Sequence, residues 1–304
     1  MLFYLEIENY ELKIGVSTGV FETIHPNTTI GHVHLTVSSL ERSKQFYCEI
    51  IGFQILRQNE SSATLTADGV TPLVVLEERK DAVRKPRRTM GLYHFAILVP
   101  DRASLANTLF HLLQKGYPLQ GASDHQFSEA LYLADPDGNG IEIYADRSRQ
   151  TWEKGENGEY KAVTTPLDVK ELLAEANAAS YKGLPSETRI GHVHLHVARI
   201  QEAERFYNEG LGFGTTLKID DHAIFVAAGG YHHHIGLNTR AGVGAPKPPE
   251  NAVGLYLFSI ILPNEEEREK IIRRLKAIGV SIELKSGNVF VKDYSGNQIQ
   301  LKTQ

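Results

Sequence analysis

The sequence predicts an α+β protein made of four βαβββ repeats. The first observation is an internal duplication: GHVHLTVSSLERSKQFYCEIIGFQI begins at Gly31 and GHVHLHVARIQEAERFYNEGLGFGT begins at Gly191, an offset of 191 − 31 = 160 residues. GLYHFAILVP and GLYLFSIILP are separated by 163 residues, and DPDGNGIEIY and DYSGNQIQLK by 158 residues. Three pairs at nearly one offset indicate two halves of the same architecture. Each half divides again, because a similar strand start recurs near residues 31, 91, 191 and 254.

The elements of the first repeat can be predicted in order. Alternating apolar and polar residues over 32–37 predict a half-buried strand. Ser38 or Ser39 can cap a helix whose apolar residues recur at helical spacing, and Gly52 ends that helix. Strands are then expected in the β-rich runs FQILRQ, ATLTA and TPLVVLEE, which turn residues separate. We expect the same order of one strand, one helix and three strands in all four repeats.

Composition limits the classes of function. The 304 residues are 41% hydrophobic and 23% charged, with a net charge of -5. This balance argues against a nucleic-acid binder, whose surface would be basic. No apolar run approaches the roughly 18 residues of a membrane span. The single cysteine, Cys48, excludes a disulfide framework and is typical of a reducing compartment, so we expect a cytoplasmic protein.

The domain organisation follows from the positions of the repeats. We expect residues 1–27 to form an N-terminal extension, which lacks the charged start of a signal peptide. Residues 28–146 would hold the first pair of repeats and 190–304 the second pair. The polar stretch 147–189 would be a connector, with a helix in LDVKELLAEA.

In their repeats and in the DPDGNG turn, residues 30 to 303 resemble the vicinal-oxygen-chelate superfamily. This family is also called the glyoxalase/bleomycin resistance/dioxygenase superfamily. The resemblance implies that the repeats pair into two modules with curved mixed sheets. It also implies a metal held by one histidine from the first strand of one unit and by a histidine and a glutamate from its partner unit. His94 and Glu142 match the second histidine and the glutamate.

Glu142 follows the DPDGNG turn in an otherwise apolar strand, Ile-Glu-Ile. The turn would bring Glu142 beside the strand that carries His94. A buried carboxylate without a partner is costly, so a cation in front of it would explain its position. The alternative is a strand whose polar face simply meets water. Two imidazoles and one carboxylate are the facial ligand set of non-haem Fe(II) sites, and Mn(II) takes the same set.

The third ligand has two candidates, His32 and His192, which occupy equivalent places in their repeats. Pairing of the first and second units would select His32, and pairing of the second and third would select His192. The resemblance implies an acid–base histidine in the unit that donates this ligand, and His233 in GGYHHHIGLN matches it, whereas TPLVVLEERK has no histidine. We therefore favour His192. The fourth unit has Leu257 and Gln300 where the second has its two ligands, so it cannot complete a triad.

The chain is further similar to extradiol catechol 2,3-dioxygenases of the two-module type. Their signature matches His125, Tyr132, the Asp-Pro of the turn, a glycine and Glu142, with Ser123 as a departure. The resemblance implies that an Fe(II) site cleaves catechol with O2 to 2-hydroxymuconate semialdehyde. His233 would act as acid–base residue, while His125 and Tyr132 would hydrogen-bond the substrate oxygen. Apolar walls from residues such as Phe95 and Phe127 would exclude water.

Other histidines and other functions remain open at this point. We expect His34 and His196 to pack or form hydrogen bonds, whereas the role of His194 stays undecided. One rival function is another metalloenzyme of the fold, such as a glyoxalase, a thiol transferase or a hydroquinone dioxygenase. The other is a metal-free drug-binding protein. The expected partners are a small aromatic diol and O2, with no nucleic acid and no membrane; sheet edges of this fold often pair between chains, which is compatible with a homo-oligomer.

Overall fold

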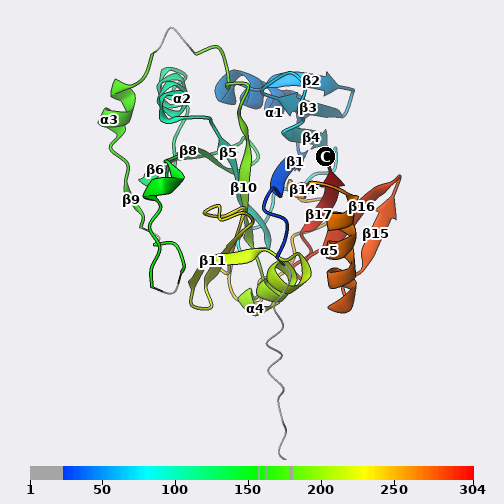
Figure 1. Ribbon diagram of the computed structural model, residues 1–304. Helices are drawn as coiled ribbons and strands as arrows, with labels where there is room; N and C mark the ends of the chain where they lie inside the picture. Colours follow the sequence, from blue (N-terminus) through cyan, green and yellow to red (C-terminus); the bar gives the residue numbers. More distant parts are fainter. Residues whose placement is uncertain (1–22, 157, 162, 178–180) are drawn as a thin grey trace, which may run out of the picture.

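Two curved mixed sheets form the centre of the molecule (Figure 1). The computed structural model describes residues 23–304 except 157, 162 and 178–180, and the structural statements below concern these residues. The predicted extension 1–27 therefore lies mostly outside the described residues. Of its last residues, Ile24 is buried and donates its N–H to the carbonyl of Gly212. None of the described helices is both long and apolar enough to cross a bilayer.

The first repeat has the predicted order of elements. It contains β1 (Thr29–Val37), α1 (Leu40–Gln45), the π-helical turn η1 (Phe46–Ile51), β2 (Gln54–Gln58), β3 (Ser62–Thr66) and β4 (Val74–Glu78). Ser39 caps α1, since its hydroxyl accepts the N–H of Arg42. Gly52 ends the helical segment with φ 98°, a conformation that glycine adopts without strain.

The second repeat and the connector follow. The second repeat contains β5 (Gly91–Leu98), α2 (Arg102–Gln114), β6 (Gly121–Asp124), β7 (Ser128–Ala134) and β8 (Gly140–Asp146). The connector contains η2 (Arg149–Thr151), β9 (Thr165–Pro166) and α3 (Val169–Ala174). The helix expected in LDVKELLAEA is thus α3, and Asp168 caps it by accepting the N–H groups of Lys170 and Glu171.

The last two repeats use the same plan. The third contains β10 (Arg189–His196), α4 (Ile200–Glu204), η4 (Arg205–Gly210), β11 (Gly214–Ile219), β12 (Ala223–Ala227) and β13 (Ile235–Asn238). The fourth contains β14 (Gly254–Leu262), α5 (Glu265–Ala277), β15 (Ile282–Lys285), β16 (Asn288–Lys292) and β17 (Gln298–Thr303).

Each sheet joins one repeat from each half of the chain. One sheet has the strand order β15-β16-β17-β14-β1-β4-β3-β2 and so combines the fourth and first repeats. The other has the order β11-β12-β13-β10-β5-β8-β7-β6-β9 and combines the third and second repeats, with β9 of the connector at its edge. The α+β fold of four paired βαβββ repeats is therefore confirmed, and the pairing is the one on which the choice of His192 depended.

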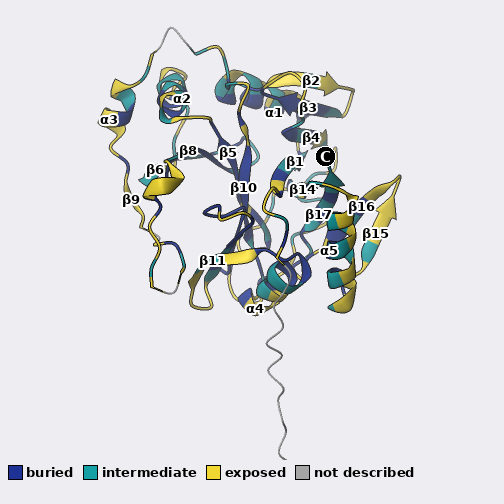
Figure 2. Cartoon of the chain, viewed as in Figure 1, coloured by how far each residue is buried: buried dark blue, intermediate teal, exposed yellow. Residues whose placement is uncertain are grey.

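The apolar core lies on one face of each sheet, beneath the helices. Alternate side chains are fully buried there: Val33, Leu35 and Val37 of β1, Val193 and Leu195 of β10, and Val197 directly after β10. Figure 2 shows the central strands β5 and β10 in the buried colour, while β2, β15 and the outer side of the helices are exposed. The alternation places the strand histidines on the opposite face, which leaves that face for a site.

Candidate metal centre and active site

Three neighbouring strands bring His94, Glu142 and His192 to one point. In the central strand β5, Ala96 is paired with His192 of β10 on one side and with Glu142 of β8 on the other. His94 lies two residues before Ala96 and therefore on the same face. The single methyl group of Ala96 leaves room between the larger side chains. Strand order makes β10, β5 and β8 neighbours, and the register between them brings the three side chains together.

The donor atoms of these three residues suit a divalent cation. Nε2 of His94 and Nε2 of His192 lie 3.1 Å and 3.3 Å from Oε2 of Glu142, and all three residues are buried. Despite these short distances, both ring nitrogens have no hydrogen-bond partner of acceptable geometry among the described residues. Facial ligands of a first-row cation lie about 3 Å from one another, with lone pairs that point to a common centre. The arrangement fits a metal better than an ion pair.

The pKa shifts of Glu142 and His192 are consistent with a metal site. Burial alone raises the pKa of the Glu142 carboxyl, but the neighbouring His192 and His94 outweigh it and hold that pKa well below its ordinary value. Burial lowers the pKa of His192 to about 4, against the opposing effect of Glu142. A neutral imidazole and an ionised carboxylate are the protonation states that metal binding requires.

The turn before β8 positions Glu142 by means of Asp135. Oδ1 of Asp135 accepts the backbone N–H of Asn139 at 2.8 Å, and Oδ2 accepts the hydroxyl of Tyr47 from the first repeat at 3.0 Å. Asp293 forms the same two contacts, with Asn297 and Tyr207, in the sheet that lacks the triad. The aspartate of this turn therefore has a structural function in both halves, whereas the residue that follows the turn differs: Glu142 in one half and Gln300 in the other.

A cavity of about 550 Å³ opens onto the sheet face that carries the triad. His94, Glu142, His125, Tyr132 and His233 all line it. Its apolar wall comes from Phe127 in the β6–β7 turn, from Leu217 and Ile219 of β11 and from Phe225 of β12. Phe127 is where it was expected, but the expectation for Phe95 was wrong. Phe95 is adjacent to His94 in a strand and therefore points to the opposite face, into the core against Tyr47.

His125 and Tyr132 form a hydrogen-bonded pair in this cavity. Nε2 of His125 lies 2.6 Å from the hydroxyl of Tyr132, and Nδ1 lies 3.1 Å from the hydroxyl of Thr164 in the connector. Tyr132 is paired with Glu142 across β7 and β8. Burial, and then the Glu142 charge, raises the pKa of Tyr132 well above its ordinary value, so the phenol keeps its proton at neutral pH. The pair can offer a hydrogen bond next to the triad.

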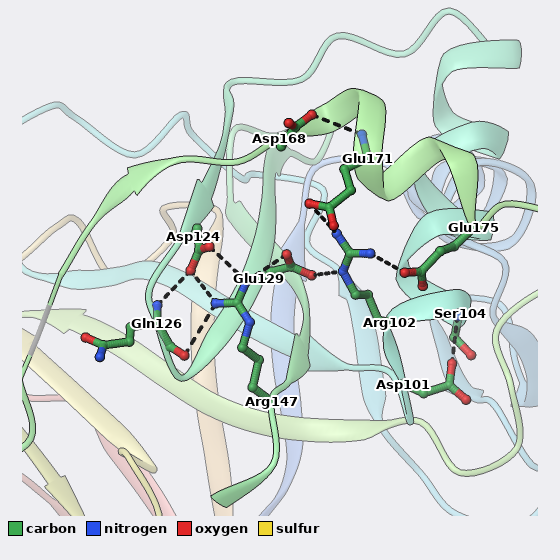
Figure 3. Close-up of polar contacts among 10 residues, drawn as sticks. All are labelled: Asp101, Arg102, Ser104, Asp124, Gln126, Glu129, Arg147, Asp168, Glu171 and Glu175. Carbon is green, nitrogen blue, oxygen red and sulfur yellow. Dashed lines mark hydrogen bonds and ion pairs between the residues drawn. The ribbon is translucent and has the colours of Figure 1, made fainter. Parts of the chain in front are cut away.

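A buried ion-pair network holds the β6–β7 turn that carries His125 (Figure 3). Glu129 is 4% exposed and accepts from Arg102 at 2.6 Å and from Arg147 at 2.9 Å. Arg147 also donates to Asp124 and to the carbonyl of Gln126, the residues on either side of His125. Arg102 extends the network to the acidic side chains of α3, Glu171 and Glu175. The network thus joins β7, α2, the connector helix and the turn.

Substitution of Glu129 is expected to destabilise the protein measurably. Glu129→Gln removes the buried charge that both arginines share, and loss of hydrogen bonds to charged groups should lower the free energy of unfolding by about 2 kcal/mol. Urea unfolding measures this loss. The matched control is Glu204→Gln, which breaks a half-exposed pair with Lys218 and should cost under about 1 kcal/mol. Equal losses in the two variants would contradict the network.

The run of three histidines lies immediately before β13 rather than within a strand. Gly229 and Gly230 adopt φ 58° and 64° and turn the chain after β12, and β13 begins only at Ile235. All three histidines are nevertheless buried. His233 lines the cavity, and its ring centroid lies 4.2 Å from that of His192.

His32 lies in the other sheet, where the described residues form no second triad. Its Nδ1 is 2.9 Å from the hydroxyl of Ser259, and β1 pairs with β14 and β4 instead of β5. His34 contacts Glu77 at 2.8 Å and packs on Tyr256. His196 is 2.8 Å from Asn238. His34 packs and His196 forms a hydrogen bond, in agreement with the expectation for them.

Several cavity residues escaped the sequence analysis. His194, left undecided there, lines the cavity and its Nε2 accepts from Asn238 at 2.7 Å. Tyr160 and Thr164 reach the cavity from the connector, and Arg240 reaches it from the loop after β13. Residues that enter from irregular segments follow no periodic pattern. Only Arg240, two residues after the β13 sequence IGLN, has a position that the sequence indicates.

Comparisons with known proteins agree with this fold. The model of the Glyoxalase/Bleomycin resistance protein/Dioxygenase superfamily matches residues 29–143 and 189–301. A catechol-2,3-dioxygenase from Bacillus subtilis (strain 168) is 50% identical over 273 residues, which cover 89% of this chain and 95% of that protein. The biphenyl-2,3-diol 1,2-dioxygenase 3 of Rhodococcus globerulus is 27% identical over 186 residues, 58% of this chain and 95% of that protein. A solved structure of a provisionally assigned dioxygenase from Bacillus subtilis subsp. subtilis str. 168 shares the fold, with a TM-score of 0.64 and 12% identity over 93% of this chain and 86% of that chain.

Proposed function

We propose, from the premise that this chain belongs to the Glyoxalase/Bleomycin resistance protein/Dioxygenase superfamily, that it is an extradiol ring-cleaving dioxygenase. Its substrates would be a small aromatic diol and O2, and catechol would yield 2-hydroxymuconate semialdehyde. The observation that carries the proposal is that His94, Glu142 and His192 converge beside a cavity whose lining includes His233 and the His125–Tyr132 pair. Glyoxalases, thiol transferases and metal-free binding proteins have no need of all these groups together.

His94, His192 and Glu142 would hold one divalent cation, which we propose to be Fe(II), with Mn(II) as the ion that takes the same ligands. Such an ion supplies a Lewis acid that lowers the pKa of a chelated hydroxyl group and gives access to O2 chemistry. Three protein ligands leave positions for a two-oxygen substrate and for O2. The buried ring nitrogens that lack hydrogen-bond partners support this ligand set.

The other cavity residues would handle protons and exclude water. Burial, and then the neighbouring histidines, hold the pKa of His233 well below its ordinary value, so its neutral ring can accept the proton of a substrate hydroxyl and later return it. The hydroxyl of Tyr132 and the ring of His125 would hydrogen-bond the substrate oxygen and the ring-opened product. Phe127, Leu217 and Ile219 would keep water from the reacting ring.

Composition supports the proposed partners and cellular compartment of the enzyme. The net charge of -5 supports a small-molecule substrate and no nucleic-acid partner. The lone Cys48 supports a reducing compartment, and we propose the cytoplasm.

Ring cleavage can be tested directly. Protein purified anaerobically, supplied with Fe(II) and mixed with catechol and O2 is expected to form a yellow product, with one O2 consumed per catechol. Absorbance and an oxygen electrode follow the two quantities. Iron-replete protein that produces no yellow compound and consumes no O2 with catechol or its ring-substituted derivatives would contradict the proposal.

His233 is expected to act in turnover and not in metal binding. His233→Phe should keep the bound iron and lower kcat about 100-fold or more, because a positioned acid–base residue contributes about 10²–10⁴-fold. Metal analysis and steady-state kinetics provide the two measurements. The control is His34→Phe in the sheet without the triad, which should leave both unchanged. Native turnover in His233→Phe would refute the assigned role.

A further inference from the structure

A chain of hydrogen bonds connects His233 to a carboxylate outside the triad. Nδ1 of His233 lies 2.7 Å from Nδ1 of His232, and Nε2 of His232 lies 3.0 Å from Oδ1 of Asp146. Both rings are buried, and Asp146 is the last residue of β8, four positions after Glu142. Neither His232 nor Asp146 has a role in the function proposed above.

The chemistry of these groups determines where the protons lie. An ionised carboxylate can only accept, so Nε2 of His232 carries a hydrogen. In its neutral form the His232 ring then has its lone pair at Nδ1. Because two bare or two protonated nitrogens 2.7 Å apart could not form a hydrogen bond, Nδ1 of His233 must carry the hydrogen of that contact. A neutral His233 with its proton at Nδ1 has a bare Nε2.

We propose that Asp146 and His232 are positioning residues that hold His233 in the tautomer whose Nε2 is free to accept a proton. This inference rests on the proposed function and deepens it. When a substrate O–H bond breaks and the Nε2–H bond forms, His233 becomes an imidazolium whose Nδ1–H already donates to His232. The ring does not have to turn. A carboxylate orients the histidine of a serine hydrolase triad in the same manner, with no intervening ring.

Packing keeps the two rings in place for this role. His232 stacks on Phe127, with ring centroids 4.6 Å apart and planes 15° apart, and Tyr231 covers it at 4.1 Å. His233 lies against Phe225, with centroids 5.1 Å apart. Oδ1 of Asp146 also lies 3.3 Å from the hydroxyl of Tyr231, so two donors hold the carboxylate in a fixed orientation. The arrangement is complete before substrate binds.

The tautomers can be measured without turnover. In 15N-histidine-labelled protein with diamagnetic zinc(II) in place of iron, nitrogen chemical shifts and one-bond N–H couplings show which ring nitrogen is protonated. We expect His233 to carry its hydrogen at Nδ1 and His232 at Nε2. A hydrogen at Nε2 of His233 in the native protein would overturn the inference. This measurement stands even if catechol proves not to be a substrate, so failure of the inference and failure of the proposed function are distinguishable.

Two variants at position 146 give the functional test. Asp146→Leu removes the acceptor of the His232 hydrogen bond, so the Nδ1–H form of His233 should no longer be favoured. We expect kcat to fall about 100-fold, while the iron content stays unchanged and KM stays within about twofold of the native value. Asp146→Asn keeps an oxygen acceptor, so its kcat should be at least about tenfold higher than that of Asp146→Leu. His234→Asn, in the same histidine run but outside the cavity lining, should leave kcat and the tautomer of His233 unchanged. Full kcat in Asp146→Leu would overturn the inference; should that variant not fold, the tautomer of the native protein decides.

Discussion

Glu142→Ala is expected to abolish metal binding and ring cleavage together. Glu142 provides the only carboxylate of the three converging side chains, and two neutral imidazoles alone neither neutralise a divalent cation nor enclose it. Loss of a group that merely supports a ligand costs about 10–100-fold in metal affinity, and loss of the ligand itself should exceed that range. Iron content after anaerobic reconstitution and gel filtration, followed by O2 uptake with catechol, measures both effects.

A matched control exists in the fourth repeat. Gln300 is the residue of β17 that corresponds to Glu142, and it donates to Asn288 on the surface. Gln300→Ala should bind iron and cleave catechol as the native protein does. Circular dichroism separates ligand loss from unfolding. Native iron content in Glu142→Ala would show that the metal is held elsewhere.

The comparison of His192→Ala with His32→Ala has the second largest expected effect. Both histidines stand in the same GHVHL sequence, so they are matched in local context. We expect His192→Ala to lose iron and activity to the same extent as Glu142→Ala, because its Nε2 is 3.3 Å from the Glu142 carboxylate. His32 contacts Ser259 in the other sheet, so His32→Ala should retain iron and turnover. Release of iron by His32→Ala alone would reverse the assignment of the ligands.

The fold could be predicted from the sequence because the duplication repeats whole elements at one offset. The pairing of repeats could not be derived from strand patterns, because identical GHVHL strands carry no information about their distant neighbours. It depended instead on one asymmetric feature, the histidine run of the third repeat. The β10–β5 pairing shows why that feature was informative, since it brings His192, with His233 beside it, next to the strand that carries His94.

The site was predictable where its residues lie on strands and less so elsewhere. His94 and Glu142 follow from strand position and from the turn that precedes β8. Phe95 was assigned to the cavity although the two-residue period of a strand, applied from His94, already places it on the other face. Thr164 and Tyr160 come from the connector, and Asp146 contacts His232 from a strand distant in sequence; such long-range contacts leave no pattern in the sequence.

The central claim is that His94, His192 and Glu142 coordinate one cation between two repeats from different halves of the chain. Crystals grown anaerobically with Fe(II), measured on both sides of the iron absorption edge, locate the metal directly. The account predicts a single strong anomalous peak in the 550 Å³ cavity, about 2.1 Å from Nε2 of each histidine and from a carboxylate oxygen of Glu142. Iron bound at any other position, or a Glu142 side chain turned to bulk water beside a bound metal, would contradict it.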